Sequence, residues 1–330
     1  MILREFLYVD TDKVRAMLAQ LDGGVVEEER ETSRHEKKNT FGPRSAAQHL
    51  RATGSERYTQ KSLGDAIFPA LEDALESESL LRDISTEAAD ISQWTSGNLK
   101  EIAPPGSLVR ITAPGSLFDT RYAAGVFSGF ASVATGLQGI GALPSSPPAG
   151  SSRTSKQGQK RPPKPDQVQP ERQLEDAIVD FHGMEGVDGA SLRSIIRMAR
   201  GIFAPGLHIN LSPVDSGEVL IGSRLQEGRQ YLDTEADILF ARYGTSRQEW
   251  TLVGSIGSYG PDDTELPDLT FTNPDGSVNR GQFADSINGL MKYLGGMGFI
   301  DLPQSPGFSL IPFAVYRSIP RRSSGIARQE

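Results

Sequence analysis

The chain of 330 residues is long enough for two domains or one large one, and its 37% hydrophobic content indicates a folded core interrupted by polar segments. Its formal net charge of -8 gives the whole molecule no field that would attract nucleic acid or an anionic membrane, so such binding would need a local basic patch. The absence of cysteine excludes disulfides, thiolate catalysis and cysteine-bound zinc, and it fits a cytoplasmic location.

The first twenty residues have the pattern of a strand, a turn and a helix. Residues 4–9 are predicted to form the strand, and Thr11 is predicted to cap a helix that ends at the glycine pair 23–24. The apolar stripe of this helix is Val14, Met17, Leu18 and Leu21. Residues 25–34 are then expected to form a charged strand, and residues 35–57 a mobile loop.

Asp10 and Asp12 lie at this strand-to-helix turn. Paired carboxylates can act as general acid and base, but they need a partner in a cleft, and none is adjacent in the sequence. Negative charge at a helix N-terminus is also what capping favours, so we expect a structural role and keep the pair as a secondary candidate site. The pattern recurs at Tyr231-LDTE, which indicates either a duplicated module or, as we favour, two helices that start alike.

The rest of the first half is predicted to be mostly helical. A capping-box-like start at 62–65 leads into a helix through Leu75 that Pro69 either kinks or delays. Its exposed face is expected to carry the acidic residues Glu72, Asp73, Glu76 and Glu78. A second helix is predicted over residues 80–100, followed by a strand at 106–113.

Residues 122–143 carry no charge over a length that could cross a bilayer, and Gly125 and Gly129 have a spacing that lets helices approach closely. The segment is nevertheless rich in glycine, alanine, serine and threonine. We therefore favour a buried helix over about 117–137, and keep membrane insertion as an alternative.

Residues 144–173 are dominated by proline, serine, glutamine and basic residues, so we predict a disordered basic linker or loop. A short helix is expected at 173–181, then a helix capped by Ser191 and stopped by Gly201. The remaining predicted elements are strands at 208–211, 217–226 and 249–258, helices at 233–243 and 283–294, and a last strand at 308–316. The glycines inside LIGSRL and LVGSIG, and Pro312 in the last strand, indicate bulges, close backbone approaches or an edge strand.

Arg193, Arg197 and Arg200 recur at i, i+4 and i+7 opposite the apolar face of their predicted helix. Such a stripe could bind phosphates or an acidic partner surface, although charged stripes are also common on exposed helices. These arginines are our candidates for partner or phosphate binding.

The remaining candidates for chemistry are few. Asp262 and Asp263 lie in an acidic loop that could hold Mg²⁺ or Ca²⁺, but the spacing does not match a calcium loop. The four histidines are His35, His49, His182 and His208, and they show no zinc-binding spacing. The sequence also lacks the nucleophile elbow, the phosphate loop and the dinucleotide turn. We therefore assign no catalytic residue, metal or cofactor.

The segments FLYVDTDKVRAMLAQLDGG, EWTLVGSIGS and IPFAVYRS resemble a family of bacterial proteins that share a domain of unknown function. The resemblance covers both ends of the chain and the strands of the second half. It implies a bacterial α+β protein whose two ends contribute to the core, and no residue roles.

The predicted fold is α+β, with a helix-rich N-terminal part at 1–143, a linker at 144–173, a C-terminal part at 174–319 with a small twisted mixed sheet, and a loose tail at 320–330. The alternative is one discontinuous domain in which the terminal strands join one sheet.

The predicted function is that of a non-enzymatic bacterial protein that binds a protein partner. The type of family that the chain resembles implies an accessory or sensor protein of a defence or stress operon. One alternative is nucleic-acid binding through the arginine stripe. The other is a membrane-acting effector that uses residues 122–143. The sequence leaves the oligomeric state open.

Overall fold

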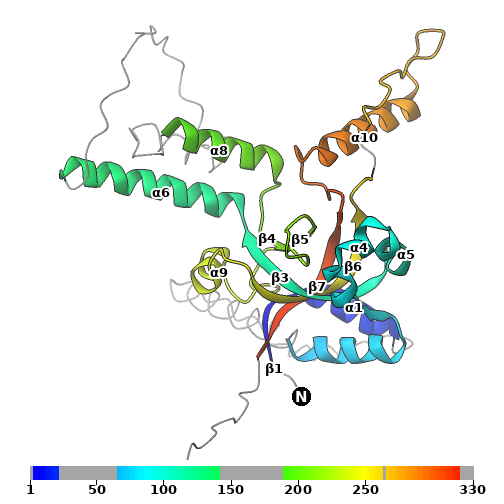
Figure 1. Ribbon diagram of the computed structural model, residues 1–330, viewed down its shortest axis with the longest axis horizontal. Coiled ribbons are helices and arrows are strands. Elements are labelled where there is room, and N and C mark those ends of the chain that lie inside the picture. The colour runs from blue at the N-terminus through cyan, green and yellow to red at the C-terminus, as the bar shows by residue number, and fades with distance from the viewer. Residues whose placement is uncertain (1–2, 22–64, 142–188, 263–264, 320–330) are drawn as a thin grey trace, which may run out of the picture. The chain divides into compact units, whose positions relative to one another are not determined.

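The computed structural model describes residues 3–21, 65–141, 189–262 and 265–319, and the fold is α+β, as predicted (Figure 1). The strands are β1 (Leu3–Val9), β2 (Leu81–Asp83), β3 (Leu108–Phe118), β4 (His208–Leu211), β5 (Leu220–Arg224), β6 (Gln248–Tyr259) and β7 (Gly307–Ile319). The helices are α1 (Thr11–Leu21), α3 (Ser85–Ala89), α4 (Ile91–Thr95), α5 (Asn98–Ile102), α6 (Thr120–Gly139), α8 (Gly189–Ile202), α9 (Ala236–Tyr243) and α10 (Arg280–Gly296), and residues 65–77 are also helical. The strand expected at 25–34, the loop at 35–57, the linker, the helix at 173–181 and the tail lie outside the described residues.

The strands form one mixed sheet that closes on itself. β3, β4, β5, β7 and β6 pair in a ring, with β6 returning to β3, so that they make a small barrel. β2 pairs with β3 on the outside, and β1 pairs antiparallel with β7. The two terminal strands therefore lie side by side, as the alternative from the sequence proposed (Figure 1). The expectation of a sheet confined to the C-terminal part is wrong, because β1, β2 and β3 precede residue 119 and their apolar residues complete the same core.

The pairing between β6 and β7 contains an irregularity that the sequence indicated. The register shifts between Val253 and Gly254, where Gly254 faces Pro312. A side chain at 254 would overlap the carbonyl oxygen of Ile311, so glycine is needed for this close approach. The bulge prediction is confirmed for this strand.

One face of the sheet is covered by α1 and the helical residues 65–77. Val14 of α1 and Phe68, Leu71 and Leu75 pack in one buried cluster against residues of β6 and β7. Helical structure begins at or before Asp65, so the proline at 69 does not delay the helix to Phe68.

The helix predicted over residues 80–100 is wrong. This stretch contains β2 and then α3, α4 and α5, each five residues long. The chain turns where aspartates accept backbone N–H groups, as Asp90 does from Ser92 at 2.9 Å, and where Gly97 adopts a φ of 76°. These local bonds compete with a continuous helix.

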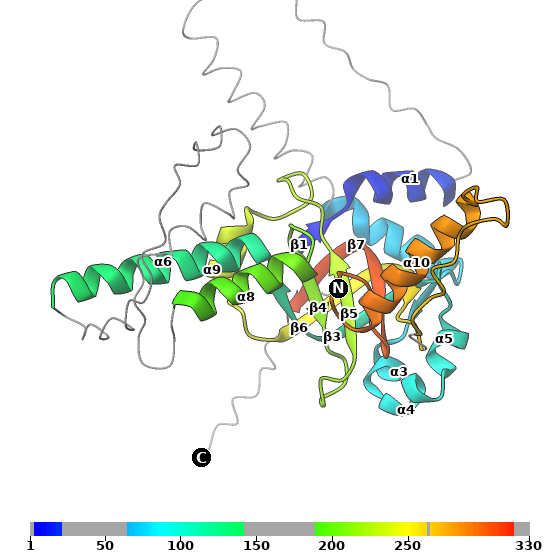
Figure 2. The ribbon, with the colours of Figure 1, turned by 90° about the horizontal axis from the view of Figure 1, so that it is seen from above.

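Among the described residues, 118–141 and 189–206, with 298–301, belong to a second compact unit that contains α6 and α8. The two helices lie side by side (Figures 1 and 2) and bury three alanines of α6 against Leu192 and Ile196 of α8. The alanines are Ala124, Ala131 and Ala134. Asp119 starts α6 by accepting the backbone N–H of Arg121 at 2.7 Å.

The uncharged segment is helical, as predicted, but its predicted burial is wrong. Val126 is 48% exposed and Val133 is 62% exposed, because only the alanine side of α6 faces α8. Among the described residues, no helix combines the length and the hydropathy that crossing a bilayer requires.

Candidate functional site

The turn between β1 and α1 holds the two carboxylates that the sequence singled out. Asp10 is 1% exposed, accepts the backbone N–H of Lys13 at 3.1 Å and pairs with Lys13 Nζ at 2.6 Å. The prediction that Thr11 caps the helix is wrong, because Thr11 is its first residue and Asp10 is the cap. A carboxylate forms the stronger, charge-assisted bond at this position.

Asp12 contacts a tyrosine from a distant part of the chain. Its Oδ2 accepts the hydroxyl of Tyr231 at 2.8 Å, and the ring centroid of Tyr231 lies 6.4 Å from that of Tyr8. Burial and the charge of Asp10 raise the pKa of Tyr8 above its ordinary value, so its hydroxyl stays protonated and is a donor rather than a base. Both carboxylates are therefore engaged in bonds that stabilise the turn.

The two echoing segments pair with each other, a contact that the sequence did not predict. The backbone N–H of Val9 donates to the carbonyl of Tyr231, and that of Asp233 donates to the carbonyl of Leu7, both at 2.9 Å. Thr11 and the corresponding Thr234 are each 4% exposed. The shared Asp-Thr pattern thus occurs in two neighbouring turns, each of which precedes a helix.

An open cavity of about 490 Å³ adjoins this turn. Its lining residues are Arg224, Leu225, Gln226, Glu227 and Tyr231. Three of them are exposed and they carry both signs of charge, whereas small-molecule sites are usually enclosed, apolar pockets with a few convergent polar groups. Asp10 and Asp12 are therefore better explained as structural residues than as a catalytic pair.

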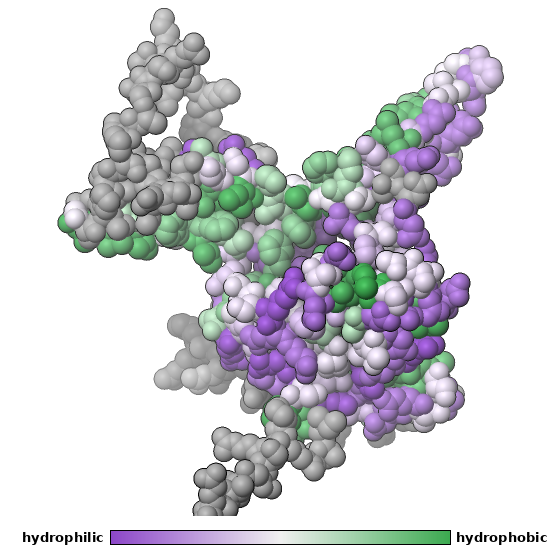
Figure 3. Space-filling view, in the orientation of Figure 1, coloured by the Kyte–Doolittle hydropathy of each residue, from purple (hydrophilic) through white to green (hydrophobic). Residues whose placement is uncertain are grey.

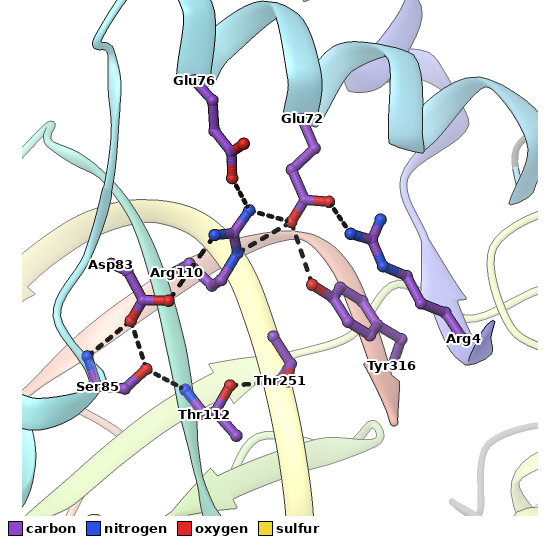
Figure 4. A network of polar contacts seen from close by, with 9 residues as sticks. All are labelled: Arg4, Glu72, Glu76, Asp83, Ser85, Arg110, Thr112, Thr251 and Tyr316. Carbon is purple, nitrogen blue, oxygen red and sulfur yellow. Dashed lines mark hydrogen bonds and ion pairs between the residues drawn. The ribbon is translucent and has the colours of Figure 1, made fainter. Parts of the chain in front are cut away.

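A buried ion-pair network surrounds Glu72, which the sequence placed on an exposed helix face (Figure 4). Glu72 is 1% exposed, so that expectation is wrong. Its carboxylate pairs with Arg4 of β1 at 2.5 Å and with Arg110 of β3 at 2.6 Å, and accepts the hydroxyl of Tyr316 of β7 at 3.1 Å. Glu72 follows Phe68 by four residues, on the apolar stripe of its helix, and this spacing could have revealed its burial.

The surroundings of the network shift the pKa values of Arg110 and Tyr316. Burial opposes the charge of Arg110, but its hydrogen bonds to Glu76 and Glu72 hold the pKa of Arg110 above its ordinary value. Burial and the nearby charge of Glu72 raise the pKa of Tyr316 to about 12. The positive charges of two arginines balance the negative charge of the Glu72 carboxylate. The arrangement therefore fits a structural role, linking the helix to three strands, better than an acid–base site.

Asp262 lies at the rim of a small cavity of about 50 Å³ that includes Trp94 and Tyr259. It pairs with Lys100 at 3.1 Å and accepts the hydroxyl of Ser305 at 3.2 Å. The hydrogen bond from Lys100 holds the pKa of Asp262 below its ordinary value. Asp263 lies outside the described residues, which contain no group of three or more histidines, aspartates and glutamates suited to a metal ion.

The arginine stripe lies on α8, whose buried residues include Leu192 and Ile196. Arg197 is exposed, and Arg193 and Arg200 are partly exposed. Each of the three arginines makes a polar, ring or electrostatic contact within the chain. The stripe is present on α8 at the predicted helical spacing.

The outer face of α6 exposes several large apolar side chains. Apolar residues gather over α6 and α8 in the space-filling view (Figure 3). Val126, Val133 and Ile140 are 48%, 62% and 78% exposed, and Met198 of α8 is 63% exposed. The sequence identified the segment by its missing charge but predicted the wrong environment for it.

The chain was compared with protein families, curated proteins and solved structures. The family model described as a domain of unknown function (DUF6414) matches residues 3–316, which confirms the resemblance indicated by the terminal segments. Neither a curated protein nor a solved structure matches the chain.

Proposed function

The chain belongs to the DUF6414 family, and we propose that it acts by binding another protein, with the outer surface of α6 and α8 as the docking surface. The observation that carries this proposal is the exposure of Val126, Val133 and Ile140 along a helix without charged residues between Tyr122 and Gly139. Contiguous exposed apolar surface on a folded protein marks interaction sites.

The arrangement of α6 supports the proposal. A helix that carries apolar residues on opposite sides normally buries both of them, yet α6 packs only its alanine side against α8. Each exposed valine or isoleucine would gain about 1 kcal/mol or more on removal from water. The outer face therefore offers a partner a substantial hydrophobic contribution to binding.

The experiment is affinity capture from the native host with the wild-type chain and the double variant Val126→Glu/Val133→Glu. We expect the variant to lose at least tenfold in captured partner, because two charges would be buried at the interface. Ile238→Glu on α9 is the matched control, since Ile238 is 42% exposed. Equal capture by all three proteins, each with an unchanged circular dichroism spectrum, would reject this docking surface.

The setting that we propose is the bacterial cytosol, with the protein as an accessory or sensor component of a defence or stress operon. The cysteine-free composition supports the compartment. The genomic neighbourhood tests the setting. We expect adjacent genes of such a system across several hosts, and unrelated neighbours throughout would contradict it.

Nucleic-acid binding is the second candidate, and the stripe of Arg193, Arg197 and Arg200 on α8 supports it. It predicts weak binding that falls steeply with salt and drops at least tenfold when all three arginines are replaced by glutamate. Fluorescence anisotropy with a labelled duplex measures this. Binding that is absent, or that the triple variant retains, would remove this candidate.

A further inference from the structure

We propose that the occupant of the outer α6 face is the same face of a second copy of this chain, so that the protein forms a symmetric dimer through α6. This inference rests on the proposed role of α6 and α8 as a docking surface and names the partner. It follows from three properties of α6: a groove, a ridge and the absence of charge.

The groove is a row of small residues. Gly125, Gly129 and Gly136 follow at i, i+4 and i+11, and no atom lies within 4 Å of the position of a Cβ added at any of them. Glycine disfavours a helix, so three glycines on one side lower the stability of α6. No packing contact of α6 within the described residues needs a glycine at these positions. Close approach of another helix backbone is the benefit that such a row provides.

The ridge lies next to the groove on the same exposed face. Val126 and Val133, with Ile140 just after the end of α6, follow at i, i+7 and i+14, about 60° around the helix axis from the glycines. In a twofold pair the ridge of each copy meets the groove of the other, because both copies present the same surface. A helix that carries both features is therefore complementary to itself.

The absence of charge favours a second copy over a charged partner surface. No acidic or basic residue occurs between Tyr122 and Gly139, so two copies bring no like charges together. A partner with acidic or basic groups at this face would have to remove them from water without finding a counter-charge.

The first test uses the absence of cysteine from the chain. Gly129→Cys should give a disulfide-linked dimer under mild oxidation at least tenfold faster than Ile238→Cys, whose side chain is similarly accessible on α9. In the proposed dimer the two introduced sulfurs are held close to each other across the twofold axis, within reach of disulfide geometry. In unassociated chains they meet only in random collisions. Equal rates for the two variants would overturn the proposal.

The second test measures association of the full-length chain by sedimentation velocity over a range of concentrations. The wild-type chain should dimerise, and Gly129→Leu should raise the dissociation constant at least tenfold by filling the groove. Gly201→Leu on α8, also without an atom within 4 Å of its added Cβ, should leave the constant unchanged. A wild-type monomer at every concentration, or a dimer that Gly129→Leu leaves intact, would overturn the proposal.

The outcomes separate this inference from the proposed function. A monomeric chain that still captures a different protein through α6 rejects the second copy and leaves the docking surface in place. A monomeric chain whose capture does not depend on α6 rejects both. Co-sedimentation of a monomeric chain with phosphatidylglycerol vesicles, lost in Val133→Glu, would assign the face to a lipid surface instead and also reject the second copy.

Discussion

Glu72 holds a charged group in the core of this fold, because two arginines and a tyrosine from three strands meet its carboxylate. A buried ion pair contributes little compared with apolar packing, but removing one partner leaves the others uncompensated. Its role is therefore best tested by removing charge while keeping shape.

Glu72→Gln should lower the free energy of unfolding by about 3 kcal/mol, because Arg4 and Arg110 lose their shared counter-charge. Glu76→Gln is the control, since Glu76 also pairs with Arg110 but its side chain is 48% exposed, and it should cost less than about 1 kcal/mol. Urea unfolding measures both. Equal effects would show that burial of the carboxylate does not matter.

Tyr316 leads to a prediction about alkaline pH. Its pKa is raised from 10.0 to about 12 in the folded chain, so above pH 10 the unfolded chain loses the proton first and the folded state loses stability. This stability is fully present below pH 10 and is lost as the pH rises through about 12. Tyr316→Phe should reduce the loss between pH 9 and 12 by on the order of 2 kcal/mol. Denaturant titrations at pH 9 and pH 12 measure the fall in the free energy of unfolding. The same fall in the variant and in the wild-type chain would contradict the raised pKa of Tyr316.

Elements with a clear apolar period were predictable from the sequence, and elements held by local polar bonds were not. The stripe of α1 and the glycine-containing strand β6 follow from residue spacing alone. Residues 80–100 form β2 and three short helices because side-chain bonds such as Asp90 to Ser92 interrupt the backbone pattern. The burial of Glu72 departs from the expected exposed face because charged side chains are normally exposed unless they are paired, and the arginines that pair with Glu72 come from distant strands.

The two mid-strand glycines should respond differently to alanine. Gly254→Ala should destabilise the chain by about 3 kcal/mol, because the new methyl overlaps the carbonyl of Ile311 in the bulge. Gly222→Ala should cost less than about 1 kcal/mol, since its Cβ would lie 3.7 Å from Asn210, an ordinary contact. Thermal unfolding distinguishes the two. A cost at 254 no greater than that at 222 would refute the close approach.

The closed arrangement of the strands could not be predicted from the sequence, because it depends on pairing between distant segments. β1 and β7 come from opposite ends of the chain, and β5 pairs in parallel with β7 across the segment that holds β6 and α10. No residue pattern in the sequence identifies β7 as the strand that pairs with β1 and with β5. The resemblance to a domain of unknown function did indicate that both ends join the core, and the pairing of β1 with β7 agrees with it.

The candidate surface was only partly predictable for a related reason. Missing charge between Tyr122 and Gly139 singled out α6, but the same composition suits a buried helix, a membrane segment or an interface. Only the packing of its alanine side on α8 shows which side chains stay exposed. The arginine stripe was predicted as a pattern, and its function remains a proposal.

The most direct measurement of the central claim is photocrosslinking inside the native host, with a photoreactive amino acid in place of Val133. We expect a crosslinked product, either with a second copy or with another protein, that is at least tenfold weaker when the same amino acid replaces Ile238. A chain that stays uncrosslinked at position 133, or reacts equally at both positions, would show that the outer face of α6 is not a docking surface.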